Sequence, residues 1–268
     1  MSDQGAPASA RDGFYGGIDS GSWNTKAVVI DAGARVLGTA VVRSGADLEA
    51  AAESAFAIAL RAAGMEAKEL GAVWATGFGR ENITFAQGTR TELDCHGRGV
   101  RHFIPGAVTV VDIGGQDAKV IKLDERGRRV SHKMNRKCAA GTGSFIDEMA
   151  LRLDVAIGEL SALAGRYEEE LELGSFCTVF TGTELLSAIR RGKRPADLAR
   201  AAYKSIVKRV LEMDVLDQQV VATGGVVAHH PMVVSLLEQA LGAKVIVPPL
   251  PQEMGALGAA LAALEAGS

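Results

Sequence analysis

The chain carries the same arrangement of an apolar run, a glycine turn and a second apolar run twice, over residues 17–30 and 108–123. In both copies an aspartate, Asp19 or Asp112, lies near the end of the first run. Short apolar runs separated by glycine turns predict β-hairpins. A repeated hairpin constrains the fold strongly, because it predicts two halves built on one plan.

The elements after each hairpin support two mixed α/β halves hinged near residue 106. In the first half we expect a strand at 35–43, a helix at 47–63 and a strand at 72–76. In the second half we expect strands at 129–134, 219–227 and 244–247, and helices at 144–153, 183–191 and 195–213. A tightly packing helix is expected at 255–263. The predicted division is a first domain at 13–106 completed by a C-terminal helix at 253–268, a second domain at 107–252 and a flexible tail at 1–12.

Composition excludes several classes of protein. With 268 residues, 47% of them hydrophobic, the chain is long enough to bury two cores. No apolar run reaches the roughly 20 residues that cross a bilayer, and the N-terminus lacks the order of an export signal, so we expect a cytoplasmic protein with no membrane partner. A net charge of −3 with both signs mixed along the chain argues against nucleic acid as a partner.

The first hairpin turn has the residue types of a phosphate loop. Gly17 and Gly21 let the backbone approach an anionic ligand, and hydroxyl and ammonium groups follow at Ser22, Thr25 and Lys26. The Asp19 carboxylate would repel a bare phosphate, so a magnesium ion held through water is expected to bridge the two.

The second turn repeats this chemistry with Asp112, Gly114, Gly115, Gln116 and Asp117. A third glycine turn follows the strand at 219–227, at Gly224 and Gly225, where a nucleoside could lie. Two ordinary hairpins with glycine turns are the alternative interpretation. Two copies with the same aspartate favour nucleotide binding.

Two cysteines, Cys138 and Cys177, each precede a glycine- and threonine-rich turn. They are too far apart for a local Cys-x-x-Cys chelate, and together they supply half the thiolates of a four-cysteine iron–sulfur cluster. Each alone could be a buried apolar side chain. Cys95, in the other half, is expected to be a packed or interface thiol.

A predicted helix follows each cysteine. Ser144 and Asp147 resemble a capping pair, followed by Phe145 and Met149 at helical spacing. In the second helix we expect Thr181 and Glu184 as the capping pair, a buried face of Leu185, Leu186 and Ile189, and a stop at Gly192. Helix N-termini carry partial positive charge, which stabilises thiolates.

The order Gly-Ile-Asp-x-Gly, Asp-Ile-Gly-Gly and Thr-Gly-Gly-Val resembles the actin, Hsp70 and sugar kinase ATPase superfamily. The segments at 111–119, 134–143, 177–180 and 255–260 resemble the activators of 2-hydroxyacyl-CoA dehydratases and the ATP-binding subunits of benzoyl-CoA reductase. This resemblance implies two RNase H-like α/β domains around a nucleotide cleft, which is the actin-like ATPase fold.

The resemblance further implies an ATPase that drives low-potential electron transfer to a partner acyl-CoA dehydratase or reductase. It implies a homodimer with one 4Fe-4S cluster held by Cys138 and Cys177 of each subunit, and ferredoxin or flavodoxin as electron donor. Carried over by position, the ATP and magnesium residues are Asp19, Gly21, Ser22, Lys26, Asp112, Gly114, Gly115, Gln116, Gly224 and Gly225. Asp112 and Gln116 are the expected catalytic residues, orienting magnesium or the attacking water.

Alternatives remain at the level of sequence. The chain could be a permanent subunit of an aromatic acyl-CoA reductase, a small-molecule kinase of the same fold, or a nucleotide sensor without turnover. The kinase hypothesis leaves Cys138 and Cys177 unexplained. We expect His96 and Arg98 to be solvated loop residues, and His229 and His230 to be loop residues without metal.

Overall fold

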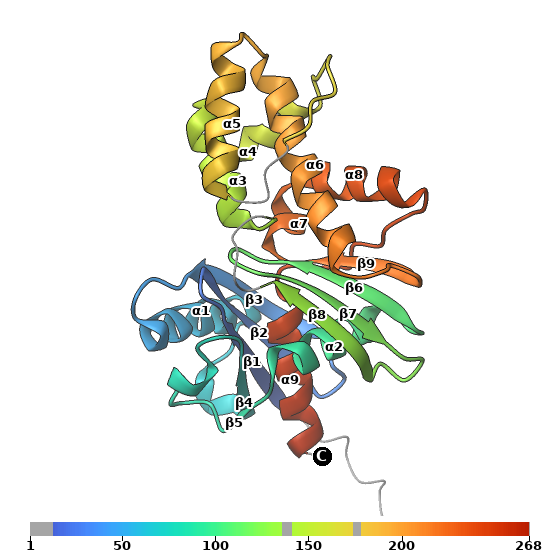
Figure 1. The fold of residues 1–268 in the computed structure, drawn as a ribbon. Coiled ribbons are helices and arrows are strands. Elements are labelled where there is room, and N and C mark those ends of the chain that lie inside the picture. Colours follow the sequence, from blue (N-terminus) through green and yellow to red (C-terminus); the bar gives the residue numbers. More distant parts are fainter. Residues whose placement is uncertain (1–12, 136–140, 174–177, 268) are drawn as a thin grey trace, which may run out of the picture. The chain divides into compact units, whose positions relative to one another are not determined.

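The structure is a computed structural model that describes residues 13–135, 141–173 and 178–267. The predicted tail at 1–12 and the two predicted cluster ligands, Cys138 and Cys177, lie outside the described residues. The chain divides into two compact units (Figure 1). Unit 1 comprises Met1–Gly99 with Gly255–Ser268, and unit 2 comprises Val100–Met254.

Unit 1 is built on a five-stranded sheet of order β3-β2-β1-β4-β5. Its strands are β1 (Phe14–Ser20), β2 (Asn24–Asp31), β3 (Val36–Arg43), β4 (Leu70–Thr76) and β5 (Gly88–Thr89). Its helices are α1 (Leu48–Ala63), the short η1 (Ala67–Glu69) and η2 (Arg80–Asn82), most of α2 (Glu92–Phe103), and α9 (Met254–Gly267). The predicted hairpin at 17–30 is confirmed, and β1 also pairs in parallel with β4.

Helix α1 forms where the sequence predicts it. The Asp47 side chain accepts a hydrogen bond of 3.0 Å from the Ala50 amide, and Gly64 ends the helix in the left-handed region at φ +69°. Its alanine-rich face, with Phe56, packs on the sheet. Gly38 of β3 is needed there, because a Cβ atom would lie 2.1 Å from the Ala59 carbonyl oxygen.

Helix α9 packs unusually closely through glycines. A Cβ atom on Gly17 would lie 2.0 Å from the Ala256 carbonyl oxygen, and one on Gly258 would lie 1.8 Å from the Cys95 carbonyl oxygen. The predicted tight packing of the last helix is confirmed. Gly17 is therefore required by the packing of α9, and its expected role in ligand approach stays a prediction.

Unit 2 has a four-stranded sheet of order β8-β7-β6-β9. Its strands are β6 (Val108–Ile113), β7 (Ala118–Leu123), β8 (Arg129–Asn135) and β9 (Gln219–Thr223). Its helices are α3 (Gly143–Leu153), α4 (Ile157–Ala164), α5 (Thr178–Arg190), α6 (Pro195–Met213), α7 (Gly225–His229) and α8 (Pro231–Leu241). The core joins strand β6 to side chains from α3, α6 and α8, including Phe145, Tyr203 and Leu237. Burying each such side chain contributes about 1.5–3 kcal/mol.

The starts of two helices differ from prediction. The N-cap of α3 is Thr142, so Ser144 lies inside the helix and its assignment as the cap is wrong. Helix α5 begins at Thr178, so Thr181 is not its cap either. The serine and threonine pattern marks a helix start only within a few residues, because any of several hydroxyl residues can take the cap position.

Two further expectations in unit 2 are corrected. On α5, Leu185 is buried, but Leu186 is 51% exposed and Ile189 is 39% exposed. The predicted strand at 244–247 is a single bridge between Val221 and Ile246. Gly192 does follow the end of α5 in the left-handed region, as predicted. In the part of the chain that the structure describes, no helix is long and apolar enough to span a membrane.

Candidate functional site

In unit 1, Asp19 lies near the end of β1 beside one residue of each neighbouring strand. Lys26 faces it in the antiparallel register of β2, and Thr76 faces it in the parallel register of β4. The Lys26 Nζ atom donates to Asp19 Oδ2 at 3.0 Å. Asp19 Oδ1 is buried and has no hydrogen-bond partner among the described residues, because the Thr76 hydroxyl donates to the Arg90 carbonyl at 2.9 Å instead.

Two glycines keep side chains away from this carboxylate. A Cβ atom on Gly77 would lie 2.4 Å from Asp19 Oδ1, and one on Gly255 would lie 2.9 Å from Asp19 Oδ2. Gly77 is also in the left-handed region at φ +90°. A buried carboxylate oxygen without a donor costs free energy unless a cation or water satisfies it. These residues therefore fit a hydrated magnesium ion.

The turn of the first hairpin is held from the end of β3. The Ser44 hydroxyl donates to the Gly21 carbonyl oxygen at 2.6 Å and lies 2.9 Å from the Thr25 hydroxyl. Ser22 is exposed at the tip. The Arg43 guanidinium lies over the Trp23 ring, with its Cζ atom 5.1 Å from the ring centroid. This contact favours a packing role for Trp23 within the hairpin. The turn thus presents Gly21 and Ser22 with a fixed backbone.

In unit 2, Asp112 lies in an equivalent register. Lys119 faces it on antiparallel β7 and Thr223 on parallel β9. Both carboxylate oxygens are engaged here: Thr223 Oγ1 donates to Oδ1 at 2.9 Å, and Lys119 Nζ donates to Oδ2 at 3.2 Å. Lys119 is only 1% exposed and also donates to Asp117 Oδ1 at 2.8 Å.

The third glycine turn touches this group directly. Gly224 has φ +96°, and its amide donates to the Pro251 carbonyl at 2.8 Å. A Cβ atom on Gly224 would lie 2.3 Å from the Ile113 carbonyl oxygen and 2.9 Å from Asp112 Oδ1. Only glycine is compatible with that conformation and that approach. The structure therefore brings the predicted second and third loops together around Asp112.

The second loop is also bonded to the first turn of α3. The Gly143 amide donates to the Gly114 carbonyl at 2.9 Å, and the Ser144 amide donates to the Gly115 carbonyl at 2.8 Å. A Cβ atom on Gly143 would lie 3.2 Å from Gly115 Cα. Any displacement of Gly114 and Gly115 must therefore move or strain the start of α3. Gln116, at the tip of the loop, is exposed.

The sequence interpretation missed Thr76 and Thr223. Each lies in an Ala-Thr-Gly triplet at the end of a strand parallel to the aspartate strand. The triplets at 75–77 and 222–224 are a sequence signal of the same internal repeat. Ser44 was missed as well, and no local pattern identifies it, because its role depends on a contact with a turn far along the chain.

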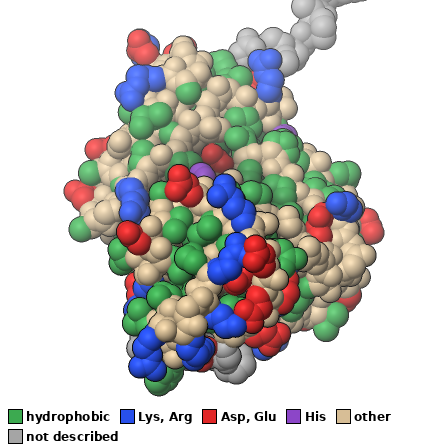
Figure 2. Space-filling model, turned by 90° about the horizontal axis from the view of Figure 1, so that it is seen from above, with side chains coloured by type: hydrophobic (Ala, Val, Ile, Leu, Met, Phe, Trp, Pro, Cys, Tyr) green, Lys and Arg blue, Asp and Glu red, His purple; other side chains and the backbone are tan. Residues whose placement is uncertain are grey.

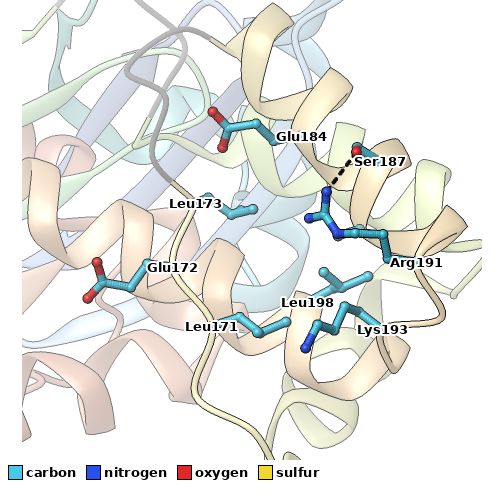
Figure 3. A pocket seen from close by; sticks show the side chains of 9 residues that line it. Leu171, Glu172, Leu173, Glu184, Ser187, Arg191, Lys193 and Leu198 are labelled. Atoms are coloured by element: carbon cyan, nitrogen blue, oxygen red, sulfur yellow. Dashed lines mark hydrogen bonds between the residues drawn. The ribbon is translucent and has the colours of Figure 1, made fainter.

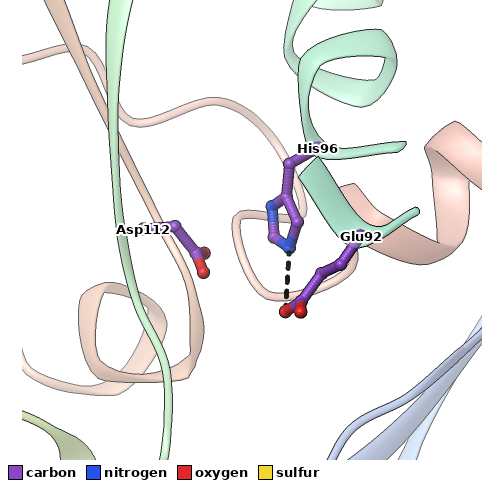
Figure 4. A group of neighbouring side chains, drawn as sticks. All are labelled: Glu92, His96 and Asp112. Atoms are coloured by element: carbon purple, nitrogen blue, oxygen red, sulfur yellow. Dashed lines mark ion pairs between the residues drawn. The ribbon is translucent and has the colours of Figure 1, made fainter. Parts of the chain in front are cut away.

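His96 is not the solvated loop residue that was expected. It lies on α2, is 4% exposed, and its Nε2 atom is 3.9 Å from Glu92 Oε1 one turn earlier (Figure 4). Figure 4 also draws Asp112, which belongs to unit 2. Arg98, on the same helix, pairs with Asp94 at 2.8 Å. The expected packing of Cys95 is confirmed, since it is fully buried and burial raises the pKa of its thiol to about 12.

The adjacent histidines also have defined partners. His229 ends α7, which corrects its loop assignment, and its Nε2 atom lies 2.9 Å from Gln252 Oε1. His230 is buried between α7 and α8, and its Nδ1 atom lies 2.8 Å from the Tyr203 hydroxyl. Burial lowers the pKa of His230 to about 4, so the ring is neutral at physiological pH.

The two α/β units, each with an aspartate near the end of a strand, indicate the fold class of the protein. The fold is that of the actin-like ATPases and sugar kinases: a ROK family glucokinase from Streptomyces griseus, solved with glucose and AMPPNP, has a TM-score of 0.57 and 16% identity, covering 94% of this chain and 100% of that chain. This likeness concerns the fold alone. The chain belongs to the BadF/BadG/BcrA/BcrD ATPase family, whose model matches residues 17–263.

One further protein and two solved structures are much more similar to the chain in sequence than the glucokinase is. The chain is 37% identical to the activator of lactoyl-CoA dehydratase from Anaerotignum propionicum, over 93% of this chain and 97% of that protein. The crystal structure of Acidaminococcus fermentans (R)-2-hydroxyglutaryl-CoA dehydratase component A has a TM-score of 0.90 and 34% identity, covering 95% of this chain and 99% of that one. The Clostridium difficile activator of 2-hydroxyisocaproyl-CoA dehydratase, solved with bound ADPNP, has a TM-score of 0.89 and 35% identity, covering 95% of each chain.

A relative with lower sequence identity is named as a subunit of a reductase. A benzoyl-CoA reductase subunit from Thauera aromatica is 30% identical over 78% of this chain and 77% of its own length. The resemblance drawn from the sequence is confirmed by these findings. They place the chain in an ATPase family with relatives named as dehydratase activators.

Proposed function

We propose that the chain is an ATP-driven activator that delivers single electrons at low potential to a partner acyl-CoA dehydratase or a related reductase. Support comes from the named relatives and from one observation in unit 2. The amides of Gly143 and Ser144 donate to the carbonyls of Gly114 and Gly115. A predicted phosphate loop is thus bonded to the helix that follows Cys138, which offers a mechanical link between nucleotide state and that cysteine.

In this proposal Asp19 and Asp112 have different roles in binding and hydrolysing ATP. Asp19 Oδ1 is unsatisfied by the described chain and would hold magnesium through water, while Gly21, Ser22 and Lys26 would contact phosphate. Asp112 is held by Thr223 and Lys119, and in this proposal it would orient magnesium or the attacking water. Gln116 would act beside it, and Gly224 and Gly225 would underlie the nucleoside. Hydrolysis converts ATP and water to ADP and phosphate.

Cys138 and Cys177 would hold a 4Fe-4S cluster shared by two copies of the chain. Such a cluster supplies storage of one electron at low potential. Helix α5 begins at Thr178, directly after Cys177, and α3 begins at Gly143. Both helix N-termini would favour thiolate ligands and an anionic group. A ferredoxin or flavodoxin would supply the electron.

The helices after the cysteines also carry exposed apolar side chains. Leu151 on α3 is 76% exposed, and Phe180 on α5 is 65% exposed. The face drawn in Figure 2 has apolar side chains reaching the surface among interspersed acidic and basic ones. Apolar side chains of this size on two helices are consistent with an interface to a second copy or a partner enzyme.

The deciding experiment is purification without oxygen, followed by iron analysis and mass measurement in solution. We expect a brown dimer with about four irons per pair of chains. Cys138→Ser and Cys177→Ser should each lose the iron and keep ATP binding. A colourless monomer with active ATPase would overturn the electron-transfer role, and loss of ATP binding in both variants would make the cysteines structural.

A second candidate is favoured by the likeness to the Thauera aromatica reductase: a permanent ATP-binding subunit of a reductase complex. Purification of the tagged protein from its native cells separates the two. A stable complex that persists without nucleotide supports the permanent subunit, and an association that requires ATP supports the activator.

A further inference from the structure

The basic side chains of unit 2 differ in how much solvent they reach. A cavity of about 250 Å³ lies beside α5, and Arg191 and Lys193 are among the residues that line it (Figure 3). Arg191 is exposed, and Lys193 donates to the exposed Glu169 carboxylate at 2.6 Å. Ion pairs at such solvated positions are individually weak. Lys119 is different, because it is the only buried lysine among the residues that the structure describes.

Two aspartates of the second loop share the Lys119 ammonium. The Nζ atom donates to Asp117 Oδ1 at 2.8 Å and to Asp112 Oδ2 at 3.2 Å. The Lys119 side chain is 1% exposed, that of Asp112 is 4% exposed and that of Asp117 is 25% exposed. Interactions between charges are strong where water is excluded. Asp117 therefore takes up part of the attraction that Lys119 would otherwise direct at Asp112 alone.

The repeated hairpin of unit 1 lacks this second carboxylate. Lys26 follows Asp19 at the same spacing as Lys119 follows Asp112, and it donates to Asp19 Oδ2 at 3.0 Å. The position that corresponds to Asp117 is occupied by Asn24, whose amide carries no charge. The additional carboxylate beside the lysine is thus specific to the hairpin of unit 2.

The turn itself does not depend on this charge. In unit 2 the Gly114 amide donates to the Asp117 carbonyl at 2.9 Å, and a Cβ atom on Gly114 would lie 3.2 Å from that carbonyl oxygen. In unit 1 a Cβ atom on Gly21 would lie 2.7 Å from the Asn24 carbonyl oxygen. Each glycine thus packs against the carbonyl three residues later, whether that residue is an aspartate or an asparagine. The Asp117 carboxylate is therefore available for a role other than forming the turn.

We propose that Asp117 is a positioning residue for ATP hydrolysis, which keeps the negative charge of Asp112 effective by sharing the Lys119 ammonium. This rests on the proposed function, in which Asp112 orients magnesium or the attacking water. A lysine bonded to Asp112 alone would offset more of its charge and weaken its attraction for a cation or a water proton. Asp117 acts through Lys119 and not by contact with the nucleotide.

The test uses the full-length protein with Asp117→Asn, Asp117→Glu and, as a control on the same hairpin, Glu125→Gln. Glu125 is exposed in the turn between β7 and β8. Two properties are measured: kcat and KM for ATP hydrolysis, and hydrogen exchange of the Lys119 ammonium by NMR of protein with ¹⁵N-labelled lysine. The ammonium signal is assigned by its loss in Lys119→Arg.

Asp117→Asn keeps the shape of the side chain and removes its charge. We expect the Lys119 ammonium to exchange about tenfold faster, because one charge-assisted hydrogen bond is weakened. We also expect kcat to fall about tenfold while KM for ATP does not rise, because the loop keeps its turn. Asp117→Glu keeps the charge and should retain most of kcat. The control should match the wild type in both measurements.

The outcomes separate the hypotheses. Unchanged ammonium exchange in Asp117→Asn would overturn the sharing of Lys119, and faster exchange with unchanged kcat would overturn the positioning role. Equal losses of kcat in the two Asp117 variants, with a raised KM, would show that the shape of the loop matters and not its charge.

Two further results are distinguishable from these. Wild-type protein that does not hydrolyse ATP would overturn the proposed function and the role of Asp117 with it, while ammonium exchange would still report on the contact with Lys119. Unfolding of Asp117→Asn is recognised by faster exchange of the β6 amides. In that case Asp117→Ser, a second neutral substitution, decides.

Discussion

In each unit an aspartate lies near the end of a strand, with a lysine and a threonine facing it on the two neighbouring strands. The two groups differ in the hydrogen bond of the threonine. In unit 2 the Thr223 hydroxyl donates to Asp112, whereas in unit 1 the Thr76 hydroxyl donates to the Arg90 carbonyl. Asp19 Oδ1 is consequently left without a donor among the described residues. The same local plan thus gives a carboxylate satisfied by the chain in unit 2, and one suited to a ligand in unit 1.

The largest effect is expected where both carboxylate oxygens are engaged. Asp112→Asn removes one of the two carboxylates that pair with the buried Lys119 and leaves Asp117 as the other, so we expect the free energy of unfolding to fall by about 3 kcal/mol, the low end for a broken buried pair. Denaturant unfolding followed by circular dichroism measures this loss. A decrease below about 1 kcal/mol, the size of an ordinary surface change, would contradict the buried hydrogen bonds described for Asp112.

The corresponding substitution in unit 1, Asp19→Asn, should lower the rate of ATP hydrolysis. Asp19→Asn removes the charge that we assign to magnesium, so kcat/KM for ATP hydrolysis is expected to fall roughly a hundredfold, about 2.7 kcal/mol. Steady-state ATPase assays over a range of magnesium concentrations test it. The unfolding free energy should change less than in Asp112→Asn. Wild-type, magnesium-dependent activity in the variant would exclude Asp19 from the metal site.

Replacing each of the two threonines by valine tests directly whether the two aspartate groups differ. Thr223→Val deprives buried Asp112 Oδ1 of its donor, so a loss of about 1–3 kcal/mol in unfolding free energy is expected. Thr76→Val removes a bond to a backbone carbonyl and should cost about 1 kcal/mol. Chemical denaturation of both variants side by side is the measurement. Equal losses would mean that the two groups do not differ as described.

The smallest effect is a pH dependence located in unit 2. His230 is neutral when folded because its pKa is lowered to about 4, while the unfolded value is near 6.5. The unfolded chain therefore binds more protons below pH 6.5, and stability is lost as pH falls from there toward 4. Between pH 7 and pH 6 the expected loss is about 0.7 kcal/mol.

Unfolding at both pH values in the wild type and in His230→Gln measures this contribution. The variant should lack that part of the pH dependence. An identical slope in both proteins would assign the effect to other groups.

Sequence patterns predicted the local elements with most success where a terminating residue was explicit. Pro195 begins α6 as predicted, and Gly64 and Gly192 follow helix ends in the left-handed region. The predicted caps were wrong because the cap of α3 is Thr142 and α5 begins at Thr178, three residues before Thr181. The solvated assignment of His96 failed because the residue lies on α2 rather than in a loop, and the burial of a helical side chain depends on tertiary packing.

The candidate site was predictable in part. The aspartates and glycines of the loops stand next to strand ends in the sequence, so their grouping within each hairpin followed from the pattern. The residues that contact these loops from other parts of the chain could not be predicted from that pattern. Thr223 is far from Asp112 in the chain and reaches it only because β6 and β9 pair in parallel.

By itself, the sequence determined the family, the repeated hairpins and the presence of an aspartate near the end of each opening strand, because these depend on residue order and on local backbone preference. Tertiary structure decided how each aspartate is satisfied. Thr76 and Thr223 occupy equivalent triplets, but one donates to a backbone carbonyl and the other to a carboxylate. That choice depends on which acceptor packing brings within about 3 Å of the hydroxyl, and no local pattern encodes it.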